Sequence, residues 1–159
     1  MDGYILKADE IADLQGLSKT HFLNDRARRI NKSLGDRTGL TGLGFHLIEV
    51  APGDLTTEHH CHAHEDECVY VLSGHATAVI GESRFPIGPG DFIGYRKQGA
   101  AHHIENTGDS PFRAIVVGER RAHDVGDYPL LGKRLYRNQG MAWNLVDVDA
   151  ISEPNAGKK

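Results

Sequence analysis

The sequence predicts an all-β protein built as a sandwich or barrel. Short apolar or alternating runs recur along its middle, and each run stops at a cluster of Gly, Pro, Asp or Ser. About seven such runs are spaced roughly eight to twelve residues apart, which favours a barrel over alternating strands and helices. The 19 glycines and 6 prolines agree with many tight turns.

The strands are predicted, in order, over residues 44–50, 68–72, 76–80, 84–87, 92–95, 102–106 and 112–118. Pro52-Gly53-Asp54 ends the first run, and Ser73-Gly74 ends the second, as expected of turn residues. No heptad pattern or repeat of fixed period is present.

The chain is expected to have three parts: an amino-terminal arm over residues 1–36, a barrel over 37–120 and an irregular extension over 121–159. Residues 8–17 could form a short helix that directs Ile11 and Leu14 inward. The extension is polar and is expected to pack on the barrel or on a neighbouring subunit. Basic residues of the two ends are expected to be solvated or to make subunit contacts; they are Arg26, Arg28, Arg29, Lys32, Lys133, Arg134 and Arg137.

Charge and hydropathy exclude several classes of partner. Eighteen basic against 22 acidic side chains give a formal charge of −4, which does not favour nucleic acid or an anionic membrane. No apolar run approaches the roughly twenty residues that span a bilayer. The first sixteen residues lack the basic and apolar regions of a signal peptide, so a cytoplasmic location is expected. The two cysteines, Cys61 and Cys68, suit a reducing compartment.

Histidines are concentrated between positions 59 and 64. Because side chains alternate along a strand, either His60 with His62 or His62 with His64 would share one face. Glu67 follows, in the same parity as two valines, while Glu65 and Asp66 are expected to be solvated. Imidazoles and a carboxylate together suit a divalent transition metal such as Mn, Fe, Co, Ni or Zn.

A second histidine pair occurs about forty residues downstream. His102 and His103 are adjacent, so only one of them can face the same side as the first pair. Asn106 follows at the end of that predicted strand.

These segments resemble the two conserved motifs of the cupin superfamily. The stretch from Pro52 through His60-x-His62-x4-Glu67-x6-Gly74 is similar to the first motif, and Gly90-Asp91 … His102-x3-Asn106 is similar to the second. The runs SLGDRTGLTG, EDECVYVLSG, GPGDFIGY and GKRLYRN extend the similarity, to a single-domain bacterial group, over residues 35–137. The chain departs from the pattern where Gly53 lies one place further from the first histidine. It departs again where Arg96 and Gln98 replace the usual proline and glycine.

The resemblance implies a double-stranded β-helix, or jelly-roll barrel, whose mouth holds one divalent transition metal. The family spacing selects His60 and His62 in the first motif and His102 in the second. The implied metal ligands are therefore His60, His62, Glu67 and His102. Cupins commonly pair their barrels, so a homodimer is expected.

The sequence leaves the reaction open between three classes. The first is an isomerase or epimerase acting on a sugar or sugar phosphate, with His46, His64 or Tyr95 as the general base. Arg96 and Lys97 could bind an anionic group of that substrate. The second is an Fe(II)-dependent dioxygenase, and the third is a non-catalytic protein that binds a small polar or anionic ligand.

Overall fold

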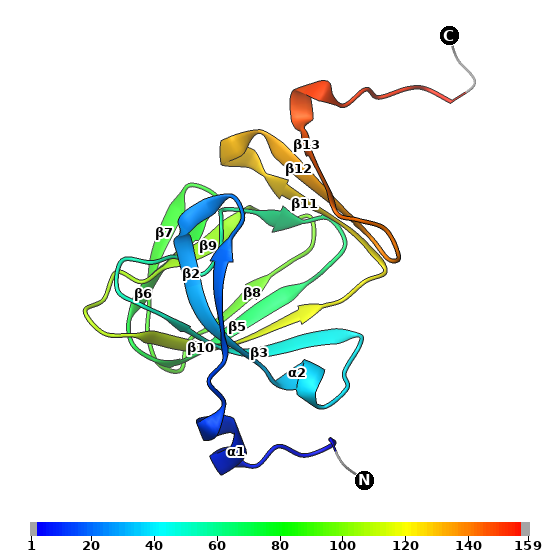
Figure 1. The fold of residues 1–159 in the computed structure, drawn as a ribbon. Coiled ribbons are helices and arrows are strands. Elements are labelled where there is room, and N and C mark those ends of the chain that lie inside the picture. Colours follow the sequence, from blue (N-terminus) through cyan, green and yellow to red (C-terminus); the bar gives the residue numbers. More distant parts are fainter. Residues whose placement is uncertain (1–2, 157–159) are drawn as a thin grey trace.

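The computed structural model describes residues 3–156, and most of its regular secondary structure is strand (Figure 1). The strands are β1 (Leu17–His21), β2 (Asn24–Ser33), β3 (Leu43–Val50), β4 (Cys61–His62), β5 (Glu67–Ser73), β6 (Ala76–Ile80), β7 (Ser83–Ile87), β8 (Phe92–Tyr95), β9 (His102–Glu105), β10 (Phe112–Glu119), β11 (His123–Tyr128), β12 (Lys133–Asn138) and β13 (Asn144–Asp147). The helices are α1 (Ala8–Asp13), α2 (Leu34–Arg37) and the 3-10 turns η1 (Pro129–Leu131) and η2 (Val148–Ala150). The predicted all-β class is confirmed.

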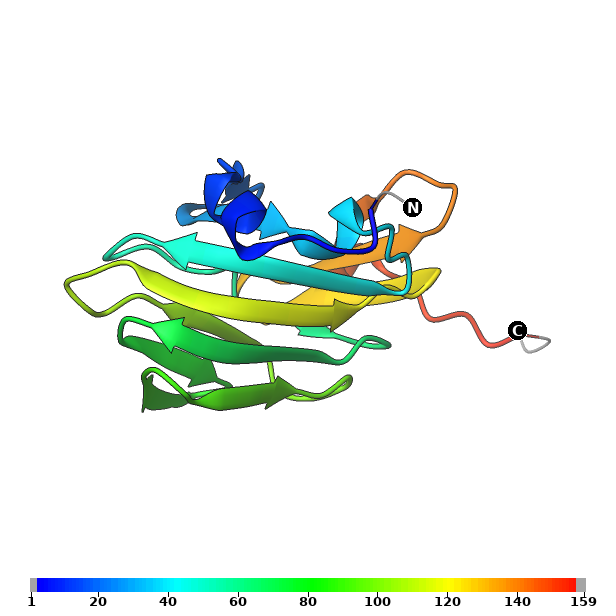
Figure 2. The same ribbon diagram turned by 90° about the horizontal axis from the view of Figure 1, so that it is seen from below.

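Two walls of antiparallel strands form the barrel. One wall is a six-stranded sheet in the order β1-β2-β3-β10-β5-β8, and Figure 2 shows β3 (cyan), β10 (yellow) and β5 (green) side by side. The other wall contains the sheets β7-β6-β9 and β13-β12-β11-β4. An isolated bridge between His60 and His102 joins these two sheets. The second wall therefore continues from β7 to β13.

The core lies between the walls and follows the alternation of the strands. On β5, Val69 and Val71 are buried, whereas Tyr70 and Leu72 face outward. From the opposite wall, residues such as Ile104 complete the same core cluster. Burying one face of each sheet in this way is the main favourable contribution to folding.

The amino-terminal segment contributes to the barrel. Helix α1 ends at Asp13, earlier than expected, because the backbone is extended at Leu14. Strands β1 and β2 then form a hairpin, and β2 pairs with β3 at the edge of the six-stranded sheet. Ala27 and Asn31 of β2 are buried, so one face of this hairpin belongs to the interior.

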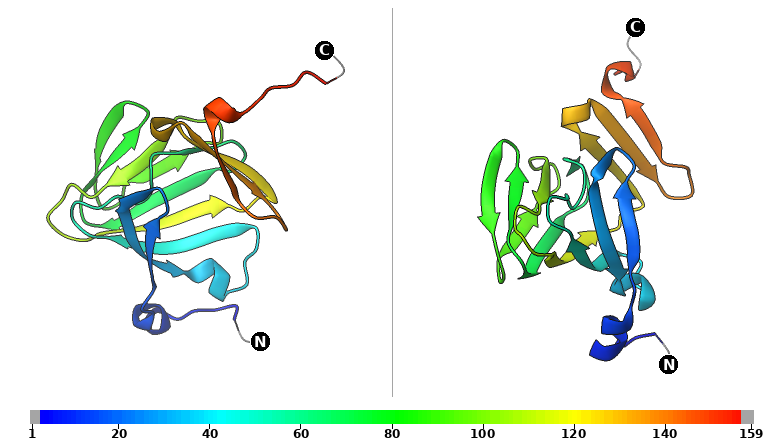
Figure 3. Two further views of the ribbon diagram at one scale, coloured as in Figure 1. Left: turned by 45° about the horizontal axis from the view of Figure 1, so that its top comes forward. Right: turned by 60° about the vertical axis from the view of Figure 1, so that its left-hand side comes forward.

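The carboxyl-terminal segment is more regular than the sequence indicated. It forms β11, β12 and β13, and β11 pairs with β4 at Gly126 opposite His62. Its polar residues are paired across strands, as in the ion pair of Arg134 with Asp127. Because these side chains are polar, the segment lacks the alternation of apolar and polar residues that predicts strands. Figure 3 shows the hairpin β1–β2 (blue) and strands β12 and β13 (orange) flanking the open end of the barrel.

Within residues 3–156, no helix combines the length and the apolar character needed to cross a membrane.

Candidate metal centre

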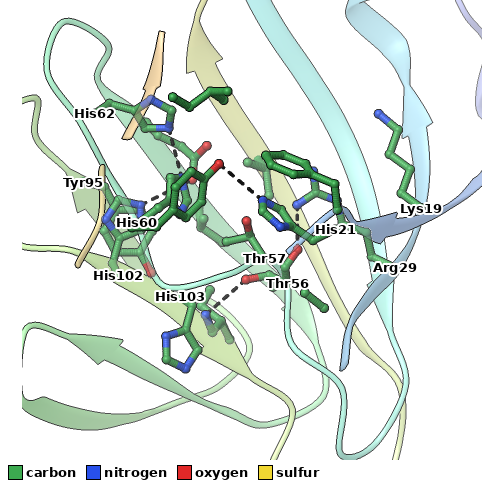
Figure 4. A pocket seen from close by; sticks show the side chains of 18 of the residues that line it. Lys19, His21, Arg29, Thr56, Thr57, His60, His62, Tyr95, His102 and His103 are labelled. Atoms are coloured by element: carbon green, nitrogen blue, oxygen red, sulfur yellow. Dashed lines mark hydrogen bonds and ion pairs between the residues drawn. The ribbon is translucent and has the colours of Figure 1, made fainter. Parts of the chain in front are cut away.

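A cavity of about 370 Å³ opens at the mouth of the barrel. Both walls line it, and the lining includes the hairpin β1–β2 of one wall and strands β11 and β12 of the other. The four ligands that the cupin resemblance implies, His60, His62, Glu67 and His102, all lie in its lining, and Figure 4 shows the three histidines. Segments separated by about forty residues of sequence therefore meet at one point.

The His60–His102 bridge brings two of these imidazoles together. The His60 amide donates to the His102 carbonyl at 3.2 Å, and the His102 amide donates back to the His60 carbonyl at 2.8 Å. Residues opposite one another in such a pair direct their side chains to the same face. The ring centroids are 4.9 Å apart. His62 lies two positions beyond His60, and their Nε2 atoms are only 3.0 Å apart.

Each of the three imidazoles is held by an acceptor on its Nδ1 side. The contacts are His60 Nδ1 to Glu58 O at 2.9 Å, His62 Nδ1 to Asp124 Oδ2 at 2.6 Å and His102 Nδ1 to Ala100 O at 3.2 Å. Carbonyl and carboxylate oxygens only accept, so each Nδ1 carries the proton and donates it. The neutral form of each ring then has its lone pair on Nε2, the atom that faces the cavity.

The pKa values of the two closest rings, His60 and His62, are shifted in opposite directions. Burial disfavours the charged form of His62, but the hydrogen bond and the negative charge of Asp124 outweigh it and raise the pKa of His62. Burial, together with the neighbouring His62, holds the pKa of His60 well below its usual range. Two nitrogen lone pairs 3.0 Å apart repel one another unless a proton or a metal ion lies between them. The position is therefore suited to a cation.

Glu67 and Tyr95 complete this side of the cavity. Glu67 Oε1 is 3.9 Å from His102 Nε2, and burial raises the pKa of the carboxyl group. The Tyr95 ring stacks on the His102 ring, with centroids 3.6 Å apart and planes only 4° apart. Within the described part of the chain, the buried His102 Nε2 and Tyr95 hydroxyl have no hydrogen-bond partner. Burial lowers the pKa of His102 to about 4, so this ring is neutral near pH 7.

A second group of ligand-type atoms lies behind His62. Atoms of His62, Glu65 and Asp124 come within 4.8 Å of one another, close enough to hold a metal ion. In the structure the Arg137 guanidinium bonds to both carboxylates, at 2.9 Å to Asp124. Glu65 also accepts from the amide of Arg121. Arg137 thus supplies the positive charge in this group. The group supports His62 on the side of the ring that carries Nδ1.

The surroundings of Glu65 and Arg137 differ from those expected from the sequence. The sequence indicated a solvated Glu65 and a surface or intersubunit Arg137, but Glu65 is 5% exposed and Arg137 lines the cavity. The cause is the pairing of β11 with β4, which places the carboxyl-terminal strands against the histidine segment.

Of the predicted catalytic and substrate-binding residues, only one lies in the cavity lining that the structure describes. Tyr95 lines the cavity. His64 is exposed, and among residues 3–156 neither it nor His46 is part of the lining; His46 instead contacts Asn31 at 3.2 Å. Arg96 and Lys97 are exposed in the loop after β8, outside the lining that the structure describes.

Other polar side chains reach the cavity from the hairpin and from β11. Lys19, His21 and Arg29 come from β1 and β2, and Tyr128 from β11. Tyr128 Oη lies 3.4 Å from His21 Nε2. In the sequence, Arg29 lies two positions from both Ala27 and Asn31, so the three share one face if residues 24–33 form a strand. That spacing is informative only if these residues are taken as a strand.

Comparisons with known proteins agree with this architecture. The cupin domain family matches residues 46–118. A crystal structure of a candidate sugar phosphate isomerase from Acidithiobacillus ferrooxidans is 48% identical, with a TM-score of 0.92, and the match covers 96% of this chain and 97% of that one. A sugar phosphate isomerase of a cupin superfamily from Silicibacter pomeroyi is 25% identical over the same shares, with a TM-score of 0.81. A cupin 2 conserved barrel domain protein from Salinispora arenicola is also 25% identical, with a TM-score of 0.51, over 59% of this chain and 77% of that one.

No curated protein shows a significant match. The barrel topology, the match to the cupin domain and the likeness in fold over nearly the whole chain lead to one assignment: this chain belongs to the cupin superfamily.

Proposed function

We propose that this cupin is a metal-dependent enzyme of the sugar phosphate isomerase or epimerase type. In this proposal His60, His62, Glu67 and His102 bind one divalent metal ion. The observation that carries it is the shared tautomer of the three imidazoles, whose Nδ1 atoms donate to three separate acceptors and leave three Nε2 atoms for the cavity. Imidazole ligands oriented by hydrogen bonds on the other ring nitrogen are typical of metal sites.

The donor set supports a transition metal. The buried His102 Nε2 has no partner within residues 3–156, and a metal ion would supply one. Three imidazoles with one carboxylate suit Mn, Fe, Co, Ni or Zn better than Ca or Mg, which prefer oxygen ligands. Bound there, the metal would supply Lewis-acid polarisation of a carbonyl or hydroxyl oxygen.

The surrounding side chains can handle protons. Burial raises the pKa of Tyr95 well above its usual value, so its hydroxyl stays protonated and can donate a hydrogen bond to a substrate oxygen. His21 and His103 line the cavity outside the proposed ligand set. Burial lowers the pKa of both rings, so each is neutral near pH 7. The Leu23 amide donates to His21 Nδ1 at 3.2 Å, so His21 Nε2 carries the proton and can donate a hydrogen bond. His103 is the ring that can accept a proton from a sugar carbon. His103 is therefore our candidate for the base, because it lies in the described lining and His46 and His64 do not.

The relatives support a small anionic substrate. The 48% identical structure is described as a candidate sugar phosphate isomerase, and the 25% identical one as a sugar phosphate isomerase. The cavity of about 370 Å³ has the size of a small-molecule site.

Metal analysis of the purified protein with a panel of sugar phosphates tests the proposal. We expect about one transition metal per chain and metal-dependent isomerisation, both lost in His60→Ala. His64→Ala is the matched control, because it removes an exposed histidine from the same segment, and it should keep both properties. Full metal content or full activity in His60→Ala would contradict the proposal.

The same ligands also suit an Fe(II)-dependent dioxygenase, which is the second candidate. Oxygen uptake after anaerobic iron loading would favour it, whereas equal turnover with zinc or nickel would exclude redox chemistry. Tight calorimetric binding of a sugar phosphate without any product would instead favour a non-catalytic binding protein.

We also propose a homodimer. Strand β1 is an edge of the six-stranded sheet. Its first residue, Leu17, is 61% exposed, and Phe22, which follows its last residue, is 56% exposed. Exposed edges with apolar side chains favour pairing with a second chain. Light scattering coupled to size exclusion tests this, and a mass of one chain at micromolar concentration would contradict it.

A further inference from the structure

We propose that Lys19 and Arg29 form the subsite that binds the phosphate group of the substrate. This inference rests on the proposed function, because it assigns one end of the substrate to the same cavity. Figure 4 shows the two cations on one side of the cavity, with His60, His62 and His102 on the other. A phosphate bound at the cations would leave the sugar extending toward the histidines.

The first argument is the pairing of two like charges. Lys19 of β1 and Arg29 of β2 are direct cross-strand partners in the hairpin, and both line the cavity. Like charges directly opposite one another destabilise a strand pair. Folding of the hairpin does not require two cations at these opposite positions. An anion that binds between Lys19 and Arg29 would explain why both are present.

The second argument is that, among residues 3–156, no carboxylate contacts either cation. In the described residues neither Lys19 nor Arg29 takes part in an ion pair, and the Arg29 guanidinium donates only to the Thr56 carbonyl, at 2.8 Å. The neighbours on β2 behave differently: Arg26 pairs with Glu105, and Arg28 pairs with Asp54. Strand alternation separates Arg28 from Arg29, so only Arg29 is directed to the cavity.

The third argument comes from the electrostatics around Arg29. Burial lowers the pKa of Arg29, and Glu67 opposes this effect through space. Burial and the charge of Arg29 likewise lower the pKa of Lys19, and Asp36 opposes this effect through space. The carboxylates that act on the two cations thus do so through space, without an ion pair among the described residues. Arg137, the other arginine of the lining, is already neutralised by Glu65 and Asp124.

Charge and shape favour a phosphate monoester over a carboxylate. Two adjacent cations match the charge of a phosphate dianion, whereas a carboxylate carries a single charge. Arginine presents planar paired donors that suit phosphate oxygens, and lysine adds a mobile point charge. Arg29 lies deeper in the cavity and Lys19 is more exposed at its rim, so we expect Arg29 to contribute more.

Calorimetric titration of the purified protein with inorganic phosphate tests the subsite. We expect phosphate to bind the wild type, to bind Arg29→Gln roughly tenfold or more weakly, and to bind Lys19→Gln several-fold more weakly. Arg28→Gln is the matched control, because it removes the same charge from the neighbouring position of β2, which is exposed and outside the described cavity lining, and it should bind like the wild type. Arg29→Gln should keep or raise the melting temperature measured without phosphate, because the repulsion from Lys19 is removed.

Two further arms separate this inference from its alternatives. His60→Ala should still bind phosphate; if it loses binding while Arg29→Gln keeps it, the anion binds at the histidines and the subsite is refuted. Acetate should bind more weakly than phosphate, and equal affinity would refute the assignment to phosphate monoesters. Phosphate binding that depends on Arg29, in a protein without metal or isomerase activity, would refute the proposed function and leave the subsite standing.

Discussion

Asp124 accepts a hydrogen bond from His62, with 2.6 Å between Oδ2 and Nδ1, across strands that lie 62 positions apart in the sequence. Asp124 is 1% exposed, and it also accepts from the His64 amide and from Arg137. These contacts hold the pKa of Asp124 well below its usual range despite its burial, with His62 as the main cause. The carboxylate therefore fixes both the orientation and the tautomer of His62.

Asp124→Asn should weaken metal binding by about ten- to a hundredfold, the usual effect of losing a partner that orients a ligand. An amide can present its NH₂ group to Nδ1 and so favour the wrong tautomer of His62. Competition with a chromogenic chelator measures the affinity. Asp127→Asn, on the same strand but paired with Arg134, is the control and should bind metal normally. An unchanged affinity in Asp124→Asn would show that His62 is not oriented by this carboxylate.

Phe112→Ala should be strongly destabilising. The Phe112 side chain is fully buried in the core cluster, and removing a buried aromatic ring leaves a cavity that costs about 3–5 kcal/mol. Phe92→Ala removes the same ring from a position that is 68% exposed, and we expect its effect to be within about 0.5 kcal/mol. Urea unfolding of both variants measures the difference. Equal midpoints would show that the core is not centred on β10.

Gly74→Ala should cost more than Gly53→Ala. Both glycines have positive φ, at 81° and 83°, so each alanine meets a backbone cost of about 1–2 kcal/mol. A Cβ at Gly74 would also lie 2.6 Å from the Pro111 carbonyl oxygen, whereas a Cβ at Gly53 would meet nothing within 4 Å. The free energies of unfolding therefore separate steric overlap from backbone strain. A larger loss in Gly53→Ala would contradict this description of the two turns.

The ion pair of Asp36 with Arg120 should contribute stability that depends on pH. The hydrogen bond from Arg120, with help from Ser33, lowers the pKa of Asp36 to about 2. Because the folded state has the lower pKa, the contribution is fully present above the ordinary value near 3.8 and is lost as the pH falls toward 2.

Arg120→Gln should therefore be less stable than the wild type at pH 6, and the two should converge near pH 2. The Asp36 side chain is 53% exposed, so solvent screening keeps the difference below about 1 kcal/mol. Melting temperatures across this range measure it. Arg113→Gln, which removes the exposed ion pair of Arg113 with Glu49, is a control for general charge effects. A difference that persists unchanged at pH 2 would contradict the assignment to Asp36.

The sequence by itself determined the all-β class, the metal-type histidine pattern and the cupin resemblance. These features are local: strand alternation relates His60 to His62, and turn residues such as Gly74 mark where strands end. The family spacing then singled out Glu67 and His102, and the fold brings both into the same cavity.

Only the tertiary structure decided which distant groups surround those histidines. Pairing of β11 with β4 brought Asp124 and Arg137 behind His62, and pairing of β2 with β3 directed Arg29 into the cavity. Arg96 is close in sequence to Tyr95 yet lies outside the described lining. Alternation shows which residues share a face of one strand, but it cannot show what that face meets, because the partner strand comes from a remote part of the chain.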